Sequence, residues 1–546
     1  DYILMTEGGK FSVFKEFLVY VRSDSDADEY GEIQLPSGAE IIRARVYHPD
    51  GTFNDSYRIS NAGRTYITVD GIRPNSLLHI AYRTRVYDYT YFGSKYYSSF
   101  MFNIQDYWRS LKYAEVKLIN RSREKTVLYN SSLIKVEEAV YPDETILSFA
   151  AENILPRKKE NYSGYYSKSL LSYAFWNIRS ENDFDKIIAK KNYINNFSLP
   201  EGIKELKSDD DKIKIIYDYI NSKIETRGGF DYSLGSYDLM FAAKKADAED
   251  KAYLAADMLK EAGIDAFPAF VRNSFVRDGQ FFSERFSAML LYVKRKNAEP
   301  LWLDFSNKHY PVGVVSDYYA GETALVFTGS GVDSAVVKSS EDRKTISVFK
   351  IDVKSKKFDY NSVFYGDYVY LRQYFDDERF NEKNVLTLME AYRADAAFDR
   401  LIITKDKFSF SASGILSFKA ADAGKDYIIF PFLHNSNAAA YARSVERSSP
   451  VVISESVNDE NVFEYTLPEK YVSIELNIVK KYSFGRCSAE FTLNKKKGSS
   501  VLRAVQKLYI PKGEIGTEEY AKFAEFCANV KTEEKYQLLI SADSRK

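Results

Sequence analysis

Side chains that can act as nucleophiles or metal ligands are few and scattered in this chain. It contains two cysteines, Cys487 and Cys527, and four histidines, at positions 48, 79, 309 and 434. No histidine is spaced from another histidine or from a cysteine as zinc ligands are, so we expect no metal site. We expect both cysteines in the core, and the sequence leaves open whether they form a disulfide.

The stretch 246–272, ADAEDKAYLAADMLKEAGIDAFPAFVR, has the layout of a helix followed by a core strand. Asp247 is a suitable N-cap, and acidic residues follow in the first turn, where the helix dipole favours negative charge. Alanines at helical spacing predict a small-residue face for close packing. Gly263 marks the end of the helix, and 264–271 reads as a buried strand. This layout can present a nucleophile at a helix N-terminus, but the residue there is Ala248.

The same stretch resembles the nucleophile segment of bacterial transglutaminase-like domains, which have a papain-like cysteine-hydrolase fold. Members of that family carry G-D-C-K-D-K-A, then an apolar helix ending in A-G-I, then a strand containing Pro. This chain has ADAEDKA, EAGI and AFPA at the same spacing, with Ala248 where the family has its catalytic Cys. The family's His falls on Ala288 in RFSAML, and its Asp falls on Asp304 in LWLDF.

The resemblance implies that two of three catalytic positions have lost their chemistry. In the family the Cys is activated by the His, which the Asp orients. An alanine side chain can neither attack a carbonyl nor carry a proton, so Asp304 has nothing to orient. We therefore expect no covalent acyl transfer at Ala248, Ala288 and Asp304. The two alanines reflect either natural degeneration, which we favour, or laboratory substitutions.

The resemblance also implies a concave cleft around this vestigial triad. We predict that Trp302 and Asp304 line it, together with three aromatic residues of the glycine-containing loop before the helix, Phe230, Tyr232 and Tyr237. Such a cleft can bind a peptide, a protein or a glycan without turning it over. No cofactor is expected.

The overall composition argues against several kinds of partner. The chain has 546 residues, with 76 basic and 77 acidic side chains and a net charge of -1. This balance gives no electrostatic basis for nucleic acid or an anionic membrane as the main partner. No apolar run has the length of a transmembrane segment. Hydrophobic residues make up 45% of the chain, enough for sizeable cores, and the length predicts about three domains.

Short strands separated by turns dominate residues 1–180 and predict a β-sandwich. The clearest is 76–87, in which Leu78, Ile80 and Tyr82 alternate with the residues between them. On the segments ARVYHPDG and AYRTR, this region resembles the β-rich domain of unknown function that commonly precedes transglutaminase-like domains in bacteria. The polar sequence of residues 169–196 predicts a helix.

The rest of the chain predicts two further domains and a multidomain α+β fold. Residues 181–337 form the central domain, whose helix 208–224 is capped by Ser208 and carries one apolar stripe. Residues 338–546 form a β-rich C-terminal domain. Its predicted elements are strands at 346–353, 368–374 and 415–420, a helix at 384–399, paired strands at 471–481 and 484–493, and a late amphipathic helix at 518–530.

Three functions are compatible with this organisation. The favoured one is a non-catalytic binding or scaffold protein of the cell envelope, since the resemblance implies export to the periplasm or cell surface. The second is an enzyme, either an active-site-mutated papain-like cysteine transglutaminase or peptidase acting on amide bonds, or one with its site elsewhere. In the third, the central domain only spaces two adhesive β domains.

Overall fold

The computed structural model describes residues 2–7, 10–36, 38–61, 65–86, 99–103, 105, 110–121, 127–130, 136–156, 160–163, 172–176, 185, 197–227, 236–273, 288–296, 298–372, 396–405, 409–418, 426–436, 438–444 and 446–541. They form two compact units. The first contains the described residues up to 156 together with 172–176 and 185, and the second contains 160–163 and the described residues from 197 onward.

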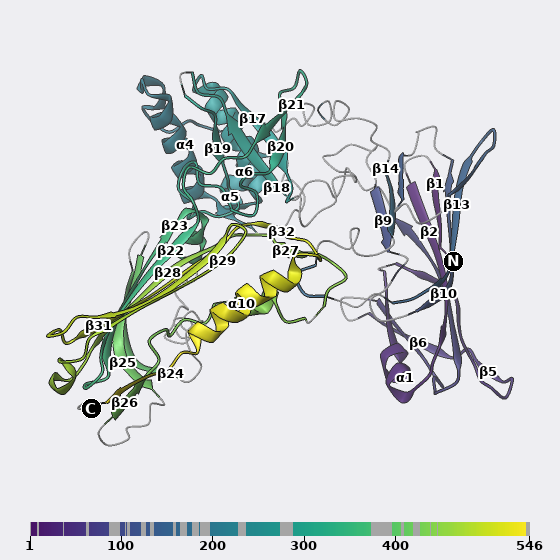
Figure 1. Ribbon diagram of the computed structural model, residues 1–546. Helices are drawn as coiled ribbons and strands as arrows, with labels where there is room; N and C mark the ends of the chain where they lie inside the picture. The colour runs from purple at the N-terminus through teal and green to yellow at the C-terminus, as the bar shows by residue number, and fades with distance from the viewer. Residues whose placement is uncertain are drawn as a thin grey trace. The chain divides into compact units, whose positions relative to one another are not determined.

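The first unit is a β-sandwich (Figure 1). Its larger sheet has the order β12-β13-β10-β1-β2-β8-β4-β5, formed by Glu137–Val140, Thr145–Ile154, Leu111–Asn120, Tyr2–Glu7, Lys10–Tyr20, Leu77–Val86, Glu40–Tyr47 and Phe53–Asn54. The sheet β3-β7-β6 consists of Glu32–Leu35, Thr65–Val69 and Tyr57–Asn61, and the sheet β11-β14-β9 of Val127–Asn130, Ser172–Trp176 and Ser99–Asn103. Helix α1 is Asp24–Tyr30, with Ser23 as its N-cap.

The core of this sandwich lies between the larger sheet and β3-β7-β6. Leu78, Ile80 and Tyr82 of β8 all point into it, because alternate residues of a strand share one face. They meet Ile67 and Val69 of β7 there. The alternation predicted for 76–87 is therefore confirmed.

The second unit begins with a small α+β region. Its sheet has the order β19-β18-β17-β20-β21, formed by Leu301–Leu303, Ala288–Val293, Ala266–Val271, Thr323–Phe327 and Val332–Val336. The helices are α4, Asp209–Lys223, α5, Tyr237–Ala243, and α6, Ala248–Glu261, with a 3-10 turn at Ile203–Glu205. Two short parallel strands, β15 and β16, are Glu225–Thr226 and Lys245–Ala246. Helix α6 packs on β17 and β18 (Figure 1).

Helices α4 and α6 form where the sequence predicts them. The Ser208 hydroxyl accepts a hydrogen bond from the Asp211 amide at 3.2 Å, so it caps α4. Four apolar residues make up the buried stripe of that helix: Ile213, Ile216, Tyr217 and Ile220. Helix α6 ends before Gly263, whose φ of 85° lies in the left-handed region that glycine adopts without strain.

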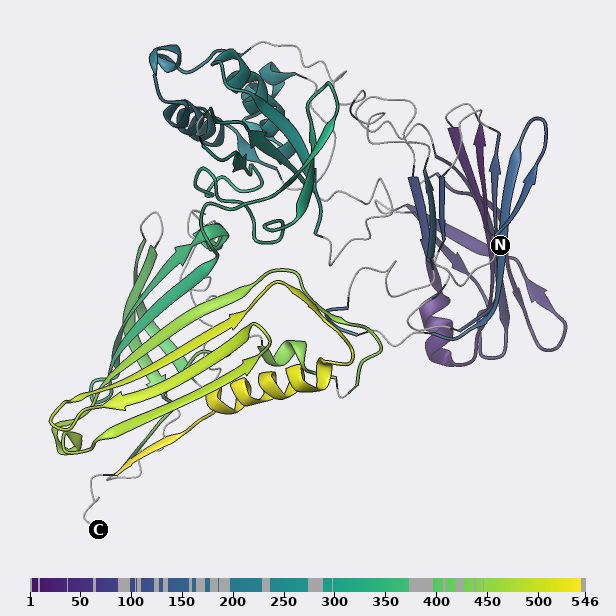
Figure 2. The same cartoon turned by 45° about the horizontal axis from the view of Figure 1, so that its top comes forward.

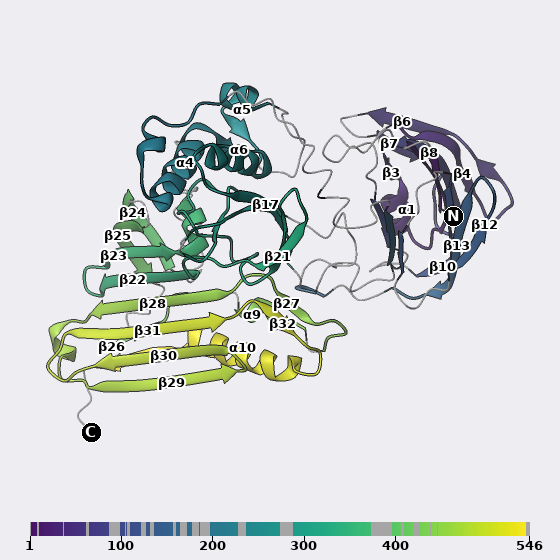
Figure 3. The same ribbon diagram turned by 90° about the horizontal axis from the view of Figure 1, so that it is seen from above.

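A second eight-stranded sheet dominates the C-terminal part of this unit (Figure 3). Its order is β24-β25-β23-β22-β28-β31-β30-β29, formed by Ala396–Lys405, Ser409–Phe418, Lys357–Tyr365, Lys344–Asp352, Val457–Thr466, Val501–Ile510, Cys487–Lys495 and Leu476–Phe484. The smaller pairs are β26-β33, Asp426–Ile429 with Leu538–Ser541, and β27-β32, Val451–Ile453 with Gly513–Ile515. Helices α9 and α10 are Ala438–Tyr441 and Tyr520–Glu534, and 3-10 helices η2 and η3 are Gly366–Arg372 and Glu469–Tyr471.

Helix α10 lies along this sheet (Figure 2) and closes its core. Its buried stripe includes Phe523 and Cys527, as the sequence predicts, and Cys487 of β30 belongs to the same core. Both cysteines are unbridged. Burial raises the pKa of Cys487 to about 11 and that of Cys527 to about 12, so neither thiol is ionised near neutral pH.

Residues 160–163 belong to the second unit although they precede 172–176 of the first. The buried Glu160 carboxylate accepts hydrogen bonds from the amides of Ser448 and Ser449, at 2.8 and 2.9 Å. The Tyr162 carbonyl accepts one from the Val452 amide at 2.6 Å. The three-domain division at 180 and 337 stays a prediction.

Some predicted elements differ in the structure. The described part of 368–374 belongs to the 3-10 helix η2, so the predicted strand is wrong there. Residues 172–176 form β14, so the helical prediction for 169–196 is wrong over them. Of the helix predicted at 384–399, residues up to 395 lie outside the described residues and 396–399 begin β24. The predicted hairpin exists, but it turns at Gly485.

The buried carboxyl of Glu534 predicts a specific pH dependence of stability. Burial raises its pKa from 4.5 to about 7, although Ser436 and Gln506 donate hydrogen bonds to it. The folded state therefore binds more protons than the unfolded state between pH 4.5 and 7, and stability is lost as the pH rises through this window. Relative to Glu534→Gln, the wild type should lose up to about 1.4 kcal/mol of unfolding free energy per pH unit between pH 5 and 7. Urea titrations at several pH values measure this difference, and a constant difference would contradict it.

Candidate functional site

The three positions that the resemblance assigns to a vestigial triad lie at the boundaries of secondary-structure elements. Ala248 is the first residue of α6, Ala288 is the first residue of β18, and Asp304 directly follows β19. Strand β17 follows α6 after a short turn and packs against it, so its last residue, Val271, lies towards the start of the helix. Val271 pairs with Ala288. Asp304 lies towards the same end, because Leu303 pairs with Leu291 of the antiparallel strand β18 and the next residue continues in the direction of Ala288. All three positions therefore lie towards one end of the sheet.

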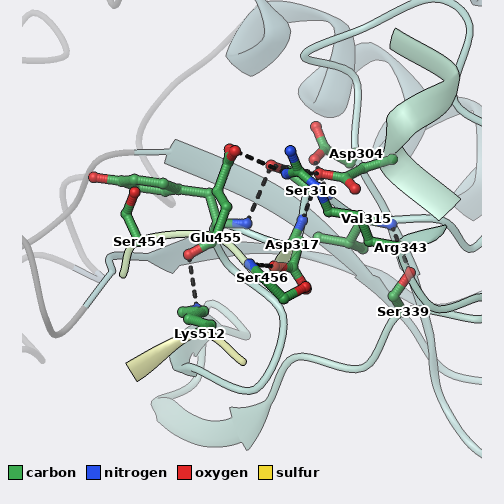
Figure 4. A network of polar contacts seen from close by, with 12 residues as sticks. Asp304, Val315, Ser316, Asp317, Ser339, Arg343, Ser454, Glu455, Ser456 and Lys512 are labelled. Atoms are coloured by element: carbon green, nitrogen blue, oxygen red, sulfur yellow. Dashed lines mark hydrogen bonds and ion pairs between the residues drawn. The ribbon is translucent and has the colours of Figure 1, made fainter. Parts of the chain in front are cut away.

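The Asp304 carboxylate connects two backbone segments, and Figure 4 shows it beside one of them, at Ser316. Its Oδ1 accepts a hydrogen bond from the Ser306 amide at 2.8 Å, and its Oδ2 accepts one from the Ser316 amide at 3.1 Å. The side chain is buried, and burial raises its pKa while these hydrogen bonds lower it. The Tyr217 hydroxyl donates to the Asp304 carbonyl at 2.8 Å. Both carboxylate oxygens are thus used by the chain itself.

The start of α6 is arranged differently from the predicted cap. Asp247 has the extended backbone of an N-cap residue, but its side chain makes no capping hydrogen bond. Arg227 takes both carboxylate oxygens instead, with Nε to Oδ1 at 3.0 Å and Nη2 to Oδ2 at 3.2 Å. This bidentate ion pair fixes the segment before α6. The predicted N-cap position of Asp247 is confirmed, but its side chain binds Arg227 and does not cap the helix.

A buried lysine lies one helical turn after Ala248, and sequence reasoning gave it no role. Lys251 is fully buried, and its Nζ donates to Asn221 Oδ1 at 2.6 Å and to Thr226 Oγ1 at 2.9 Å. Burial lowers its pKa to about 7, and Lys308 contributes in the same direction. The sequence did indicate that Lys251 is unusual, because it lies on the apolar face of the predicted helix. Lysines are seldom fully buried unless they are paired, so such a position indicates a specific partner.

Two of the aromatic residues predicted to line the cleft, Trp302 and Tyr237, are buried in the structure. Trp302 is only 2% exposed and packs in the sheet core, with the Tyr292 ring centroid 5.1 Å away. Tyr237 is fully buried and donates its hydroxyl to the Asp257 carboxylate. Neither side chain presents a surface to solvent here, so both stabilise the domain, and contact with a ligand stays a prediction. Phe230 and Tyr232 lie outside the described residues.

The described part of the chain shows neither a metal-binding cluster nor a membrane-spanning helix. The described residues contain no cluster of three or more His, Cys, Asp or Glu side chains arranged to hold a metal ion. No described helix is both long enough and apolar enough to span a bilayer.

Comparison with known proteins defines the fold. A domain of unknown function with a solved structure, DUF3858, matches residues 425–540. The crystal structure of a "putative protease" from Parabacteroides distasonis is 10% identical, covering 99% of this chain and 98% of its own, with a TM-score of 0.61. At this identity the likeness shows the fold alone, and it confirms the multidomain, strand-rich α+β class.

A second solved structure is much less similar. It is a "putative cysteine protease" from Cytophaga hutchinsonii, 11% identical, covering 38% of this chain and 75% of its own. Its TM-score is 0.16, too low to carry an argument. No match is found among curated proteins.

Introducing a cysteine and a histidine at positions 248 and 288 tests whether the predicted triad positions are adjacent. In a variant with Ala248→Cys and Ala288→His, the introduced thiol should have a pKa about one unit or more below that in Ala248→Cys alone. The helix N-terminus stabilises the thiolate in both variants, and only the double variant adds an imidazole. The rate of iodoacetamide alkylation against pH measures this pKa. The two native thiols give little background, since both are buried. Ala243→Cys with Ala288→His is the control, because Ala243 lies at the exposed end of α5. Equal pKa values with and without the histidine would place the positions apart.

Because the pKa of the buried Lys251 is lowered, stability should change with pH in the opposite direction to that caused by Glu534. Its pKa is about 7 in the folded state and 10.5 unfolded, so the folded state binds fewer protons between these values. The unfolding free energy of the wild type relative to Lys251→Met should therefore rise by up to about 1.4 kcal/mol per pH unit from pH 7 to 10. Denaturant titrations at pH 7, 8.5 and 10 check this, and a flat difference would show that Lys251 keeps its ordinary pKa.

Proposed function

We propose that the protein is a non-catalytic transglutaminase-like binding or scaffold protein of the cell envelope. Its ligand is a peptide, a protein or a glycan, held at the surface around Ala248 and Ala288. The observation that carries this proposal is the pair of alanines at the start of α6 and of β18, at the same end of the sheet as a carboxylate whose two oxygens already bind backbone amides.

The chemistry of these residues supports binding without turnover. Neither alanine supplies a nucleophile or a base, and Asp304 has no ring to orient. Both alanines are partly exposed, so the short side chains leave space where longer ones stand in active relatives. The Arg227–Asp247 ion pair and the buried Lys251 keep the start of α6 in place. A shape complementary to an amide substrate can therefore persist after its chemistry is lost.

Retention of Asp304 is the observation that favours the alternative, an active-site-mutated transglutaminase or peptidase acting on amide bonds. A carboxylate in the orienting position has no catalytic use once the histidine is gone. The variant with Ala248→Cys and Ala288→His separates the two functions. Under the alternative it cleaves or cross-links peptides, and under the proposed function it gains a reactive thiol without turnover.

A bulky residue at the start of α6 tests the binding proposal. The probes are a library of synthetic peptides and soluble glycopeptides from bacterial cell walls, with binding followed by fluorescence anisotropy. Ala248→Phe should weaken binding at least about tenfold by filling the site. The matched control is Ala243→Phe, an equally large change at an exposed helix end, which should leave affinity unchanged. Equal affinity of both variants, or cleavage of the bound peptide by the wild type, would refute the proposal.

A further inference from the structure

The backbone turn that holds Asp304 is itself held by the C-terminal part of the second unit. Ser316 donates its amide to Asp304 Oδ2 at 3.1 Å and its hydroxyl to Asp367 Oδ2 at 3.5 Å. The next amide, that of Asp317, donates to the same Asp367 oxygen at 2.8 Å. Asp367 belongs to η2, whereas Asp304 follows β19. Two adjacent residues thus connect a carboxylate of the central sheet to a carboxylate of the C-terminal region. Figure 4 shows these two residues, Ser316 and Asp317.

Further contacts fix the same turn from the other side. The Asp317 carboxylate accepts a hydrogen bond from the Ser456 amide. The Asn273 side chain donates to the carbonyls of Tyr318, at 2.8 Å, and Ser454, at 3.0 Å. Lys512 Nζ also donates to the Tyr318 carbonyl, at 2.8 Å. The turn is therefore clamped by segments 45 to 194 positions away in the sequence.

Asp367 is in turn fixed by a buried arginine. Arg343 Nη1 lies 3.3 Å from Asp367 Oδ2 and 2.8 Å from Glu455 Oε2, and its guanidinium stacks 4.0 Å from the centre of the Tyr368 ring. The Asp367 side chain is 2% exposed. Burial raises the pKa of Asp367 to about 6, against the effect of Arg343, so the group is mainly ionised above pH 7. An ionised acceptor makes stronger hydrogen bonds to amides than a neutral one.

We propose that Asp367 is a positioning residue through which the C-terminal region sets the orientation of Asp304. The path runs from Asp367 Oδ2 through the amides of Asp317 and Ser316 to Asp304 Oδ2. This path of hydrogen bonds is independent of the proposed function. Only the idea that it regulates ligand binding at Ala248 and Ala288 rests on the proposed function. A change in the C-terminal region, such as a partner docking near η2, then alters the vestigial site without touching it.

Neighbouring carboxylates of this cluster have different roles, and this difference supplies the control. Asp367 Oδ2 accepts from Arg343, from the Asp317 amide and from the Ser316 hydroxyl. Glu455 contacts Arg343, and its side chain is 38% exposed. Removing the charge of Glu455 therefore disturbs the same arginine but leaves the turn anchored.

Amide hydrogen exchange followed by mass spectrometry at pH 7.5 tests the path without any ligand. The reporter is the Ser306 amide, because its bond to Asp304 Oδ1 depends on the orientation of that carboxylate. Asp367→Asn should speed exchange at Ser306 and Ser316 at least about tenfold, and 254–259 in the middle of α6 should keep its protection. Glu455→Gln should leave Ser306 unchanged. Unchanged exchange at Ser306 in folded Asp367→Asn would overturn the proposal.

A second variant and a second readout keep the test decisive. If Asp367→Asn does not fold, Asp317→Ala releases the turn at Ser456 while leaving the Arg343–Asp367 pair intact, and Ser306 should again exchange faster. In the Ala248→Cys, Ala288→His background, Asp367→Asn should also raise the pKa of the introduced thiol, since a displaced Asp304 no longer orients the imidazole. Faster Ser306 exchange in a protein that binds none of the peptides or glycopeptides would refute the proposed function and leave the path standing.

Discussion

The need to pair polar groups inside the protein governs the central region of this chain. A buried carboxylate or ammonium without partners is very unfavourable, so each one here is bound by specific donors or acceptors. Asp304 binds two backbone amides, Lys251 binds two side-chain oxygens, and Asp367 binds an arginine and an amide. Because all of these partners except the Ser306 amide come from other segments of the chain, the bonds set how the helices, the sheet and the turn 315–318 pack together.

This constraint bears on the assignment of Asp304 as the remainder of a catalytic triad. Whatever stands at positions 248 and 288, a buried aspartate has to be satisfied. In this structure its oxygens are bonded to the chain, so Asp304 contributes to folding whether or not any ligand binds. A residue can therefore be retained for a structural reason after its original partner has gone, and its presence alone is weak support for activity.

Local patterns predicted much of the fold, and tertiary contacts decided the rest. Helix α4 and the strand β8 follow from apolar periodicity, which is a local property. The sequence pattern at 368–374 also predicts a strand. Gly366 adopts a φ of 60° and Tyr368 stacks on Arg343, however, and the described residues of this segment form a 3-10 helix. The hairpin turn lies at Gly485, with φ 51°, because glycine takes the left-handed conformation more easily than the residues before it.

The candidate site was predictable only where one segment carries the information. The positions Ala248, Ala288 and Asp304 could be assigned from the resemblance of short motifs. Lys251 finds its acceptors 25 and 30 residues away, and the turn at Asp317 is bonded to a residue 139 positions later. No single-sequence pattern reports such pairs, so the network behind Asp304 emerged only from the three-dimensional structure.

The bonds of Glu160 have a practical consequence for dividing this protein. The order of the chain suggests that the second unit can be obtained by starting near residue 197, where its continuous part begins. Such a fragment lacks the carboxylate that binds the amides of Ser448 and Ser449, and it leaves the buried Arg447 without its 3.8 Å ionic partner. A fragment meant to fold like the intact second unit must therefore begin before Glu160 or receive residues 160–163 as a separate peptide.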